Sequence, residues 1–153
     1  MPEAIKSVSE TEVPINSQNP AAVSAVVRRG NKYLLVLRAN PPAQDMYAFP
    51  GGRVDPGEAA ADAALRELKE ETGIAGISAR TYATYDLNAS GVAGKTAYHL
   101  TVFIVDEPGD VIPLPLDDAA ALGWFTIDEA GALSMPPSMH HCFSKLANTF
   151  ANG

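Results

Sequence analysis

Residues 52–74 read GRVDPGEAAADAALRELKEETGI, and this stretch decides the fold of the chain. Helix-forming Ala, Leu, Glu, Lys and Arg fill residues 59–72, and Gly73 stands where a helix C-cap belongs. The pattern predicts a helix over residues 59–72. The sequence predicts a capping box at the helix entry, because Asp55 is followed by a proline and, three positions on, by Glu58.

The predicted helix carries charge on one face and apolar side chains on the other. The apolar stripe can pack on a sheet and comprises Ala61, Leu65, Leu68 and Thr72. Three glutamates at spacing i, i+3 and i+4 share the opposite face: Glu67, Glu70 and Glu71. Like charges four residues apart destabilise an isolated helix by about 0.2–0.5 kcal/mol per pair. A hard divalent cation, which prefers oxygen ligands, would turn that repulsion into coordination.

Two interpretations of this acidic face are open. Charge runs usually form the solvated face of a surface helix. That interpretation leaves Glu58 at the helix entry, the glycine turn before it and Arg66 beside the cluster without explanation. The alternative is a metal site that promotes attack of water on a phosphorus centre, with the metal neutralising phosphate oxygens.

The sequence on both sides of the helix alternates strand patterns and turn signals. Residues 22–29 and 32–38 predict a β-hairpin around Gly30-Asn31. A short apolar segment at residues 47–49 is stopped by Pro50-Gly51-Gly52. Further strands are expected at residues 77–87, 96–106 and 123–126, a largely looped stretch at 107–122, a helical turn at 127–133 and a closing helix at 138–150. These elements predict one mixed α/β or α+β domain.

Length and composition fit a single domain. The chain has 153 residues, 46% of them hydrophobic, which is enough material for a buried core. Residues 1–20 are polar and carry three prolines, so we expect a flexible N-terminal arm followed by one domain over residues 21–153. With 11 basic and 18 acidic residues the net charge is −7, which argues against nucleic acid as a partner.

Targeting signals and cysteine content indicate a cytoplasmic protein. The sequence contains no apolar run of the length a membrane helix needs and no apolar stretch of signal-peptide type at its N-terminus. Cys142 is the single cysteine, so an internal disulfide is excluded and a reducing compartment is expected.

Next to Cys142, His140 and His141 point in different directions on a helix. We therefore predict that Cys142 is a buried small hydrophobe and not a metal ligand.

Residues 52–74 resemble the Nudix box, G-x5-E-x7-R-E-U-x-E-E-x-G-U, in which U is a bulky aliphatic residue. Every specified position is met over 23 residues, which makes the signal highly specific. A weaker resemblance extends over about residues 21–150. The matching positions are Gly52, Glu58, Arg66, Glu67, Leu68, Glu70, Glu71, Gly73 and Ile74.

The resemblance implies a fold, a chemistry and a set of site residues. Nudix proteins form an α/β/α sandwich around a mixed β-sheet and hydrolyse a nucleoside diphosphate linked to another moiety, using Mg²⁺ or Mn²⁺. By the family pattern, Arg66 would hold a glutamate in place through a charge-assisted hydrogen bond. Gly51 and Gly52 would let the backbone turn close to the metal site. The expected metal ligands are Glu67, Glu70 and Glu71, supported by Glu58.

The general base is open at this stage. In such enzymes it often comes from a loop outside the box, and Asp118 with its neighbour Asp117 is the natural candidate. Either aspartate could instead cap the next turn, and Glu67 could itself act as the base. Weaker alternatives are Asp86, Asp106, Glu107 and Asp110.

Five residues before or at the start of the box are candidates for substrate binding: Arg38, Tyr47, Phe49, Gly51 and Gly52. Arg38 ends a predicted strand, and its guanidinium suits phosphate, although an ordinary surface arginine is the alternative. Tyr47 and Phe49 could stack on a base or ribose. Aromatic residues beside a Pro-Gly-Gly turn also pack in cores, so both roles are open.

The flanking segments are similar to the small bacterial group often labelled ADP-ribose pyrophosphatase-like, so ADP-ribose or a nucleotide sugar is the expected substrate. One alternative is a (d)NTP pyrophosphohydrolase of house-cleaning type; dinucleoside polyphosphates and capped RNA rank lower. A non-enzymatic alternative is a nucleotide-sensing module of the same fold, although such proteins typically lose box carboxylates that this chain keeps. Many relatives pair, so a homodimer is a further prediction.

Overall fold

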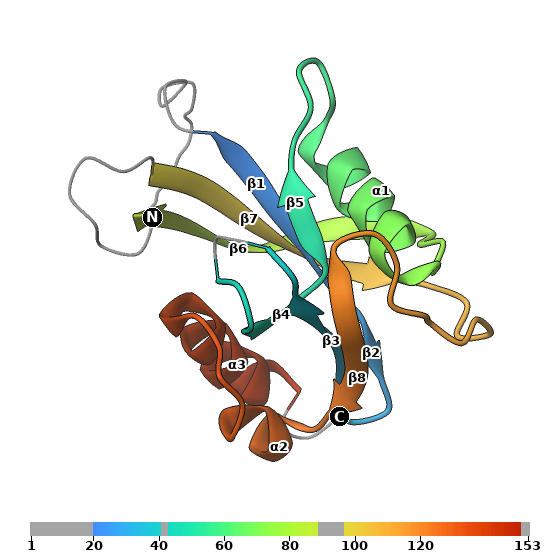
Figure 1. Ribbon diagram of the computed structural model, residues 1–153, viewed down its shortest axis with the longest axis vertical. Coiled ribbons are helices and arrows are strands. Elements are labelled where there is room, and N and C mark those ends of the chain that lie inside the picture. The colour runs from blue at the N-terminus through green and yellow to red at the C-terminus, as the bar shows by residue number, and fades with distance from the viewer. Residues whose placement is uncertain (1–19, 41–42, 89–96, 151–153) are drawn as a thin grey trace.

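The computed structural model describes residues 20–40, 43–88 and 97–150, which form two four-stranded β-sheets and three helices (Figure 1). The predicted N-terminal arm, except for Pro20, lies outside the described residues. None of the helices in the described part of the chain is long and apolar enough to cross a membrane.

The first sheet is mixed, as predicted. Its strand order is β5 (Gly51–Arg53), β1 (Ala21–Val26), β7 (Ala97–Asp106) and β6 (Ser78–Asn88). Strands β1 and β7 are parallel, whereas β5 and β6 lie antiparallel to their neighbours. Helix α1 (Ala60–Thr72) covers one face and buries Leu68 against Phe103 and Val23 in a shared core cluster.

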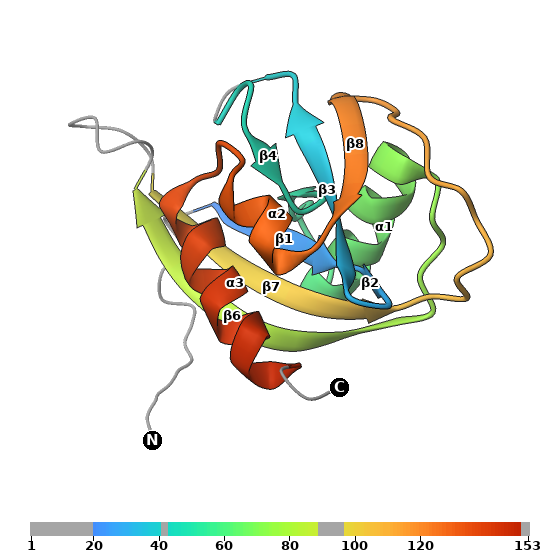
Figure 2. The ribbon, with the colours of Figure 1, turned by 90° about the horizontal axis from the view of Figure 1, so that it is seen from below.

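The second sheet is antiparallel and packs with two helices over the other face of the first. Strand β3 (Lys32–Arg38) lies between β8 (Ala119–Phe125) and two short strands, β4 (Tyr47–Ala48) and β2 (Arg28–Arg29). Helices α2 (Ile127–Gly131) and α3 (Pro137–Thr149) complete this layer, and Figure 2 shows α3 lying across β6 and β7. The α+β class and the mixed sheet are therefore confirmed.

The predicted hairpin of residues 22–29 with 32–38 is only partly formed. Arg28–Arg29 pair with Lys32 and Tyr33, and the Val27 carbonyl accepts a hydrogen bond from Leu34 N. Residues 21–26, which precede Val27, do not pair with β3; they form β1 in the first sheet. Val26 and Val27 are both buried, so the apolar residues form an uninterrupted pattern that predicts a single strand. The periodicity of the sequence does not show where the chain passes from one sheet to the other.

Two strands were misjudged from sequence. The Pro-Gly-Gly segment, expected only to stop a strand, forms β5, since Gly51 allows a backbone approach in which a Cβ would stand 2.1 Å from the Val23 carbonyl oxygen. Strand β8 begins at Ala119 and not at residue 123, because pairing with β3 overrides the weak strand propensity of alanine.

The start of α1 also differs from its prediction. The helix begins at Ala60 with Ala59 as N-cap and no side-chain cap, so the capping box at Asp55 is wrong. Instead Glu58 Oε1 accepts a hydrogen bond from Asp55 N at 3.0 Å, which closes a turn before the helix. The helix ends as predicted, with Gly73 in the left-handed conformation at φ 83°.

Candidate active site

The acidic side of α1 lies against strand β5, and two glycines make this contact possible (Figure 1). A Cβ on Gly52 would stand 2.4 Å from Glu67 Oε2, so only glycine leaves that carboxylate its position. The neighbouring Gly51 donates its N–H to Glu71 Oε1 at 3.3 Å. Strand β5 thus brings its backbone close to the carboxylates of α1, as the resemblance implies for Gly51 and Gly52.

Arg66 holds three of the motif's carboxylates together. Its Nε donates to Glu58 Oε2 at 2.8 Å and its Nη2 to Glu58 Oε1 at 2.9 Å, a bidentate pair. The same guanidinium donates to Glu67 Oε2 at 3.1 Å and to Glu70 Oε1 at 3.2 Å, and a further hydrogen bond of 2.9 Å reaches the carbonyl of Arg53. One arginine therefore orients three of the four glutamates of the motif.

The three helix glutamates do not share one solvated face. The Glu71 residue is only 6% exposed, the Glu67 side chain 14% and the Glu70 side chain 46%. Of the three, the surface-helix interpretation describes Glu70 alone. A carboxylate is rarely buried without a partner, so the depth of Glu71 needs a functional or structural cause.

The electrostatics divide the glutamates into an inner and an outer group. Burial raises the pKa of Glu71 to about 8, and the nearby charge of Glu67 contributes to the rise. Burial also raises the pKa of Glu67. In contrast, hydrogen bonds from Arg66 lower the pKa of Glu58 to about 2. The inner pair resists ionisation, and a bound divalent cation would favour its charged form.

Hard oxygen donors at this position suit a divalent cation such as Mg²⁺ or Mn²⁺. Within residues 20–40, 43–88 and 97–150, however, no three His, Cys, Asp or Glu side chains are arranged around one point as a ready metal site. The interactions of Arg66 explain this, because they draw Glu58 and Glu70 toward the guanidinium. The inner pair, Glu67 and Glu71, would form the core of a donor set.

Arg38 acts electrostatically on this cluster, and Asp118 lies in the chain segment that contacts the end of α1. Burial raises the pKa of Glu71, and the positive charge of Arg38 offsets part of that rise. Asp118 immediately precedes β8, and its Oδ1 accepts a hydrogen bond from Asn40 Nδ2 at 3.0 Å. Two residues earlier, Leu116 N donates to the Glu71 carbonyl at 2.9 Å. Asp117 and Asp118 form the turn that precedes β8, and both the structural and the catalytic interpretation of Asp118 stay predictions.

The two aromatic candidates pack in the core. Phe49 is 3% exposed and contacts the ring of Phe143 at a centroid distance of 5.2 Å. Tyr47 is half-buried and meets Phe125 edge-on at 5.4 Å. The structure therefore bears out the packing alternative for Phe49, whereas the ring of Tyr47 is part-accessible.

Three of the four weaker acidic alternatives have partners elsewhere. Asp86 pairs with His99, Asp106 accepts a hydrogen bond from Ser78, and Glu107 pairs with Arg29.

Cys142 is 1% exposed, so its prediction as a buried hydrophobe is confirmed. Asn40 was missed from sequence, because an asparagine before two prolines indicates only a loop.

Comparison with known proteins identifies the family. The family model of the NUDIX domain matches residues 18–146. The chain is 35% identical over 121 residues to the CTP pyrophosphohydrolase of Escherichia coli, covering 76% of this chain and 82% of that one. It is 45% identical over 53 residues to the ADP-ribose pyrophosphatase of Methanocaldococcus jannaschii, a match to 35% of this chain and 31% of that relative.

Solved structures agree with this fold. The MutT NUDIX hydrolase from Burkholderia pseudomallei superposes with a TM-score of 0.74 at 25% identity, over 83% of this chain and 97% of the other. The NUDIX domain of Shewanella oneidensis NrtR, determined in complex with ADP ribose, superposes with a TM-score of 0.72 at 17% identity, over 86% of this chain and 88% of that one. The match over residues 18–146, together with the carboxylates gathered around Arg66 and against Gly51 and Gly52 of β5, means that the chain belongs to the Nudix hydrolase family.

Proposed function

We propose that this protein is a divalent-metal-dependent hydrolase that cleaves the pyrophosphate bond of a nucleoside diphosphate linked to another moiety. The observation that carries the proposal is the buried pair Glu67 and Glu71 against Gly51 and Gly52 of β5, with Arg66 orienting Glu67 and the outer carboxylates. Burying two carboxylates side by side costs stability unless a cation compensates. A site of this kind is therefore better explained by metal-assisted catalysis than by packing.

The metal would be held by Glu67, Glu70 and Glu71, with Glu58 supporting the site, and Mg²⁺ or Mn²⁺ fits these hard oxygen donors. When bound, such a cation neutralises phosphate oxygens and makes water a better nucleophile. The protein's own part is to orient the carboxylates through Arg66 and to bring the backbone of Gly51 and Gly52 close.

Residues next to the cluster have the chemistry for the remaining roles. Arg38, whose charge acts on Glu71, suits binding of a substrate phosphate. Asp118 is exposed and close to a loop that is hydrogen-bonded to the Glu71 carbonyl, which supports it as general base, with Glu67 as the alternative. Tyr47 has a part-accessible ring for contact with substrate.

The first candidate substrate is ADP-ribose or a similar nucleotide sugar, in line with the name of the archaeal relative. A second candidate is a nucleoside triphosphate, because the Escherichia coli relative, of which the match covers 82%, is named a CTP pyrophosphohydrolase. Retention of all four motif glutamates argues against a sensor without activity. The single cysteine supports a reducing, cytoplasmic location, and a homodimer stays a prediction.

The test is a phosphate-release screen with Mg²⁺ and with Mn²⁺ over ADP-ribose, nucleotide sugars, NADH, dinucleoside polyphosphates and all (d)NTPs. A coupled phosphatase detects both monophosphate and pyrophosphate products. Glu70→Gln, which removes an expected metal ligand, should lower turnover by at least about a hundredfold. The matched control is Asp62→Asn, an exposed acidic residue in the first turn of the same helix.

Each outcome of the screen decides a point. Activity on one diphosphate-linked compound that is lost in Glu70→Gln and kept in Asp62→Asn would establish the substrate class and the metal dependence. Equal turnover in Glu70→Gln and the unaltered protein would refute the assigned role of the glutamates. No hydrolysis of any compound by folded protein that binds Mn²⁺ would favour the sensor alternative.

A further inference from the structure

A second site is formed between the edge strand β6 and helix α3, away from the carboxylate cluster. A pocket of about 400 Å³ lies there, a volume in the range of small-molecule sites. The residues that line it are Thr81, Tyr82, Ala83, Thr84 and Tyr85 from β6, and His141 and Lys145 from α3. No carboxylate is among them, although the protein as a whole carries a net charge of −7.

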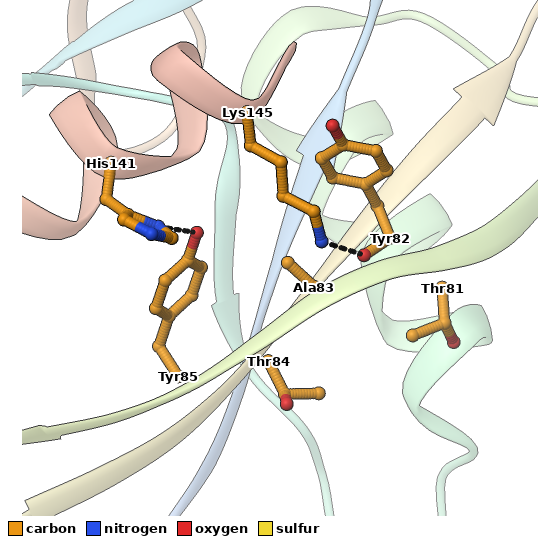
Figure 3. A pocket seen from close by; sticks show the side chains of 7 residues that line it. All are labelled: Thr81, Tyr82, Ala83, Thr84, Tyr85, His141 and Lys145. Atoms are coloured by element: carbon orange, nitrogen blue, oxygen red, sulfur yellow. Dashed lines mark hydrogen bonds between the residues drawn. The ribbon is translucent and has the colours of Figure 1, made fainter. Parts of the chain in front are cut away.

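Two pairs of side chains form the walls of this pocket, and Figure 3 shows the small side chain of Ala83 between them. On one side the Tyr85 hydroxyl lies 2.8 Å from His141 Nδ1, and the two rings meet edge-on at 5.5 Å. On the other side Lys145 Nζ donates to the Tyr82 carbonyl at 3.2 Å and lies 4.6 Å from the centroid of the Tyr82 ring. The pocket thus has an apolar floor between two aromatic rings.

The polar groups on its rim are donors. Lys145 uses one of its three N–H groups on the Tyr82 carbonyl, and no described residue supplies it with a carboxylate partner. Burial raises the pKa of Tyr85 to about 12, so its hydroxyl keeps its proton and can donate to His141 Nδ1. With that direction of donation, His141 carries its N–H on Nε2, where it is available to an acceptor.

The donors of Lys145 and His141, beside the two tyrosine rings, suit a ligand that carries both a negative charge and an aromatic ring. An ammonium group is a point charge well suited to phosphate, and tyrosine rings stack on bases of any identity. We propose that the pocket between β6 and α3 binds a nucleoside monophosphate, with the phosphate on Lys145 and His141 and the base over the Tyr82 and Tyr85 rings. The choice of a nucleotide over other aromatic anions rests on the proposed function, in which a mononucleotide is a product.

The experiment is a titration of the ¹⁵N-labelled full-length protein with AMP in the presence of EDTA, followed by amide chemical shifts. The expected result is saturable perturbation of amides in β6 and α3. Lys145→Gln should weaken AMP binding by about tenfold, the effect of losing one charge-assisted hydrogen bond. Lys69→Gln, an exposed lysine on α1 with the same charge change, should stay within about twofold of the unaltered protein.

Adenosine and inorganic phosphate, titrated separately, test the two halves of the ligand, and both should bind more weakly than AMP. Equal affinity of Lys145→Gln and the unaltered protein would overturn the proposal. So would perturbation confined to residues near Gly52 and Glu67, or no saturation below about 5 mM AMP, a limit that corresponds to negligible affinity. Because neither metal nor turnover is involved, the result is independent of whether the protein hydrolyses any compound in the screen.

Discussion

Two adjacent glycines have different roles, and substitution by alanine separates them. In Gly51→Ala the new Cβ meets the backbone of Val23, which cannot give way without breaking the β1–β5 pairing. In Gly52→Ala it meets only the end of the Glu67 side chain. We expect Gly51→Ala to lower the melting temperature strongly. Gly52→Ala should keep the fold but lose about a hundredfold in kcat/KM, because a carboxylate displaced by about 1 Å is misplaced for catalysis.

The measurements are thermal unfolding, Mn²⁺ affinity and kcat/KM on the best substrate of the screen. Gly131→Ala is the control, since a Cβ there meets no described atom within 4 Å. A Gly52→Ala variant with normal Mn²⁺ affinity and normal kcat/KM would show that the Glu67 position is not critical.

A second prediction at the residue scale concerns the shape of the Arg66 side chain. Its planar guanidinium contacts Glu58 through two nitrogens and reaches Glu67 and Glu70 at the same time. Lysine keeps the charge but has one compact donor group, so it cannot hold these carboxylates together. We expect Arg66→Lys to lower Mn²⁺ affinity and kcat/KM by about 10–100-fold. Calorimetric titration with Mn²⁺ checks this, and unchanged affinity would mean that charge alone suffices.

At the scale of the element, the end of α1 depends on a buried hydroxyl. Thr72 is 1% exposed, its Oγ1 donates to the Leu68 carbonyl at 2.7 Å, and the same oxygen accepts from Ile74 N at 3.2 Å. Thr72→Val keeps the shape but leaves the buried Ile74 N–H without its acceptor. We expect it to lower the free energy of unfolding by about 1–3 kcal/mol. Urea denaturation measures this, and Thr84→Val on the exposed side of β6 should change it little.

An element can be predicted from sequence when its signals lie within its own segment, and not when it depends on contacts with distant residues. Helix α1 and its C-cap at Gly73 were predictable because periodicity, propensity and a stop signal agree within one segment. Strand β5 was not, because its cause is the fit of Gly51 against Val23, a contact between distant segments. The same holds for the site: the spacing of the motif predicts which glutamates gather, whereas the hydrogen bond from Asn40 to Asp118 depends on a loop conformation that no local pattern encodes.

At the scale of the whole molecule, one ion pair connects the two sheets. Arg29 of β2 donates to Glu107, which follows β7, through Nε at 2.9 Å and Nη2 at 2.8 Å. The guanidinium also lies 4.8 Å from the centroid of the Trp124 ring in β8. The Glu107 side chain is only 5% exposed and that of Arg29 27%, so solvent screens the pair only in part. This bidentate contact therefore helps to fix how the sheets pack.

The last prediction follows from the pKa of Glu107, which the hydrogen bonds from Arg29 hold below its ordinary value of 4.5. A carboxyl group whose pKa is lower in the folded state contributes stability above its unfolded pKa, and loses it as the pH falls through the folded pKa. We expect Glu107→Gln to lower the free energy of unfolding by about 1–2 kcal/mol at neutral pH. The gap from the unaltered protein should begin to narrow as the pH falls below about 4.5, and it should close only below the lowered folded-state pKa, where Glu107 has lost its charge. Urea denaturation across this range tests the prediction, with Asp62→Asn, an exposed acidic residue in the first turn of α1, as control. A gap that stays constant down to acid pH would mean that Glu107 acts through packing and not through its charge.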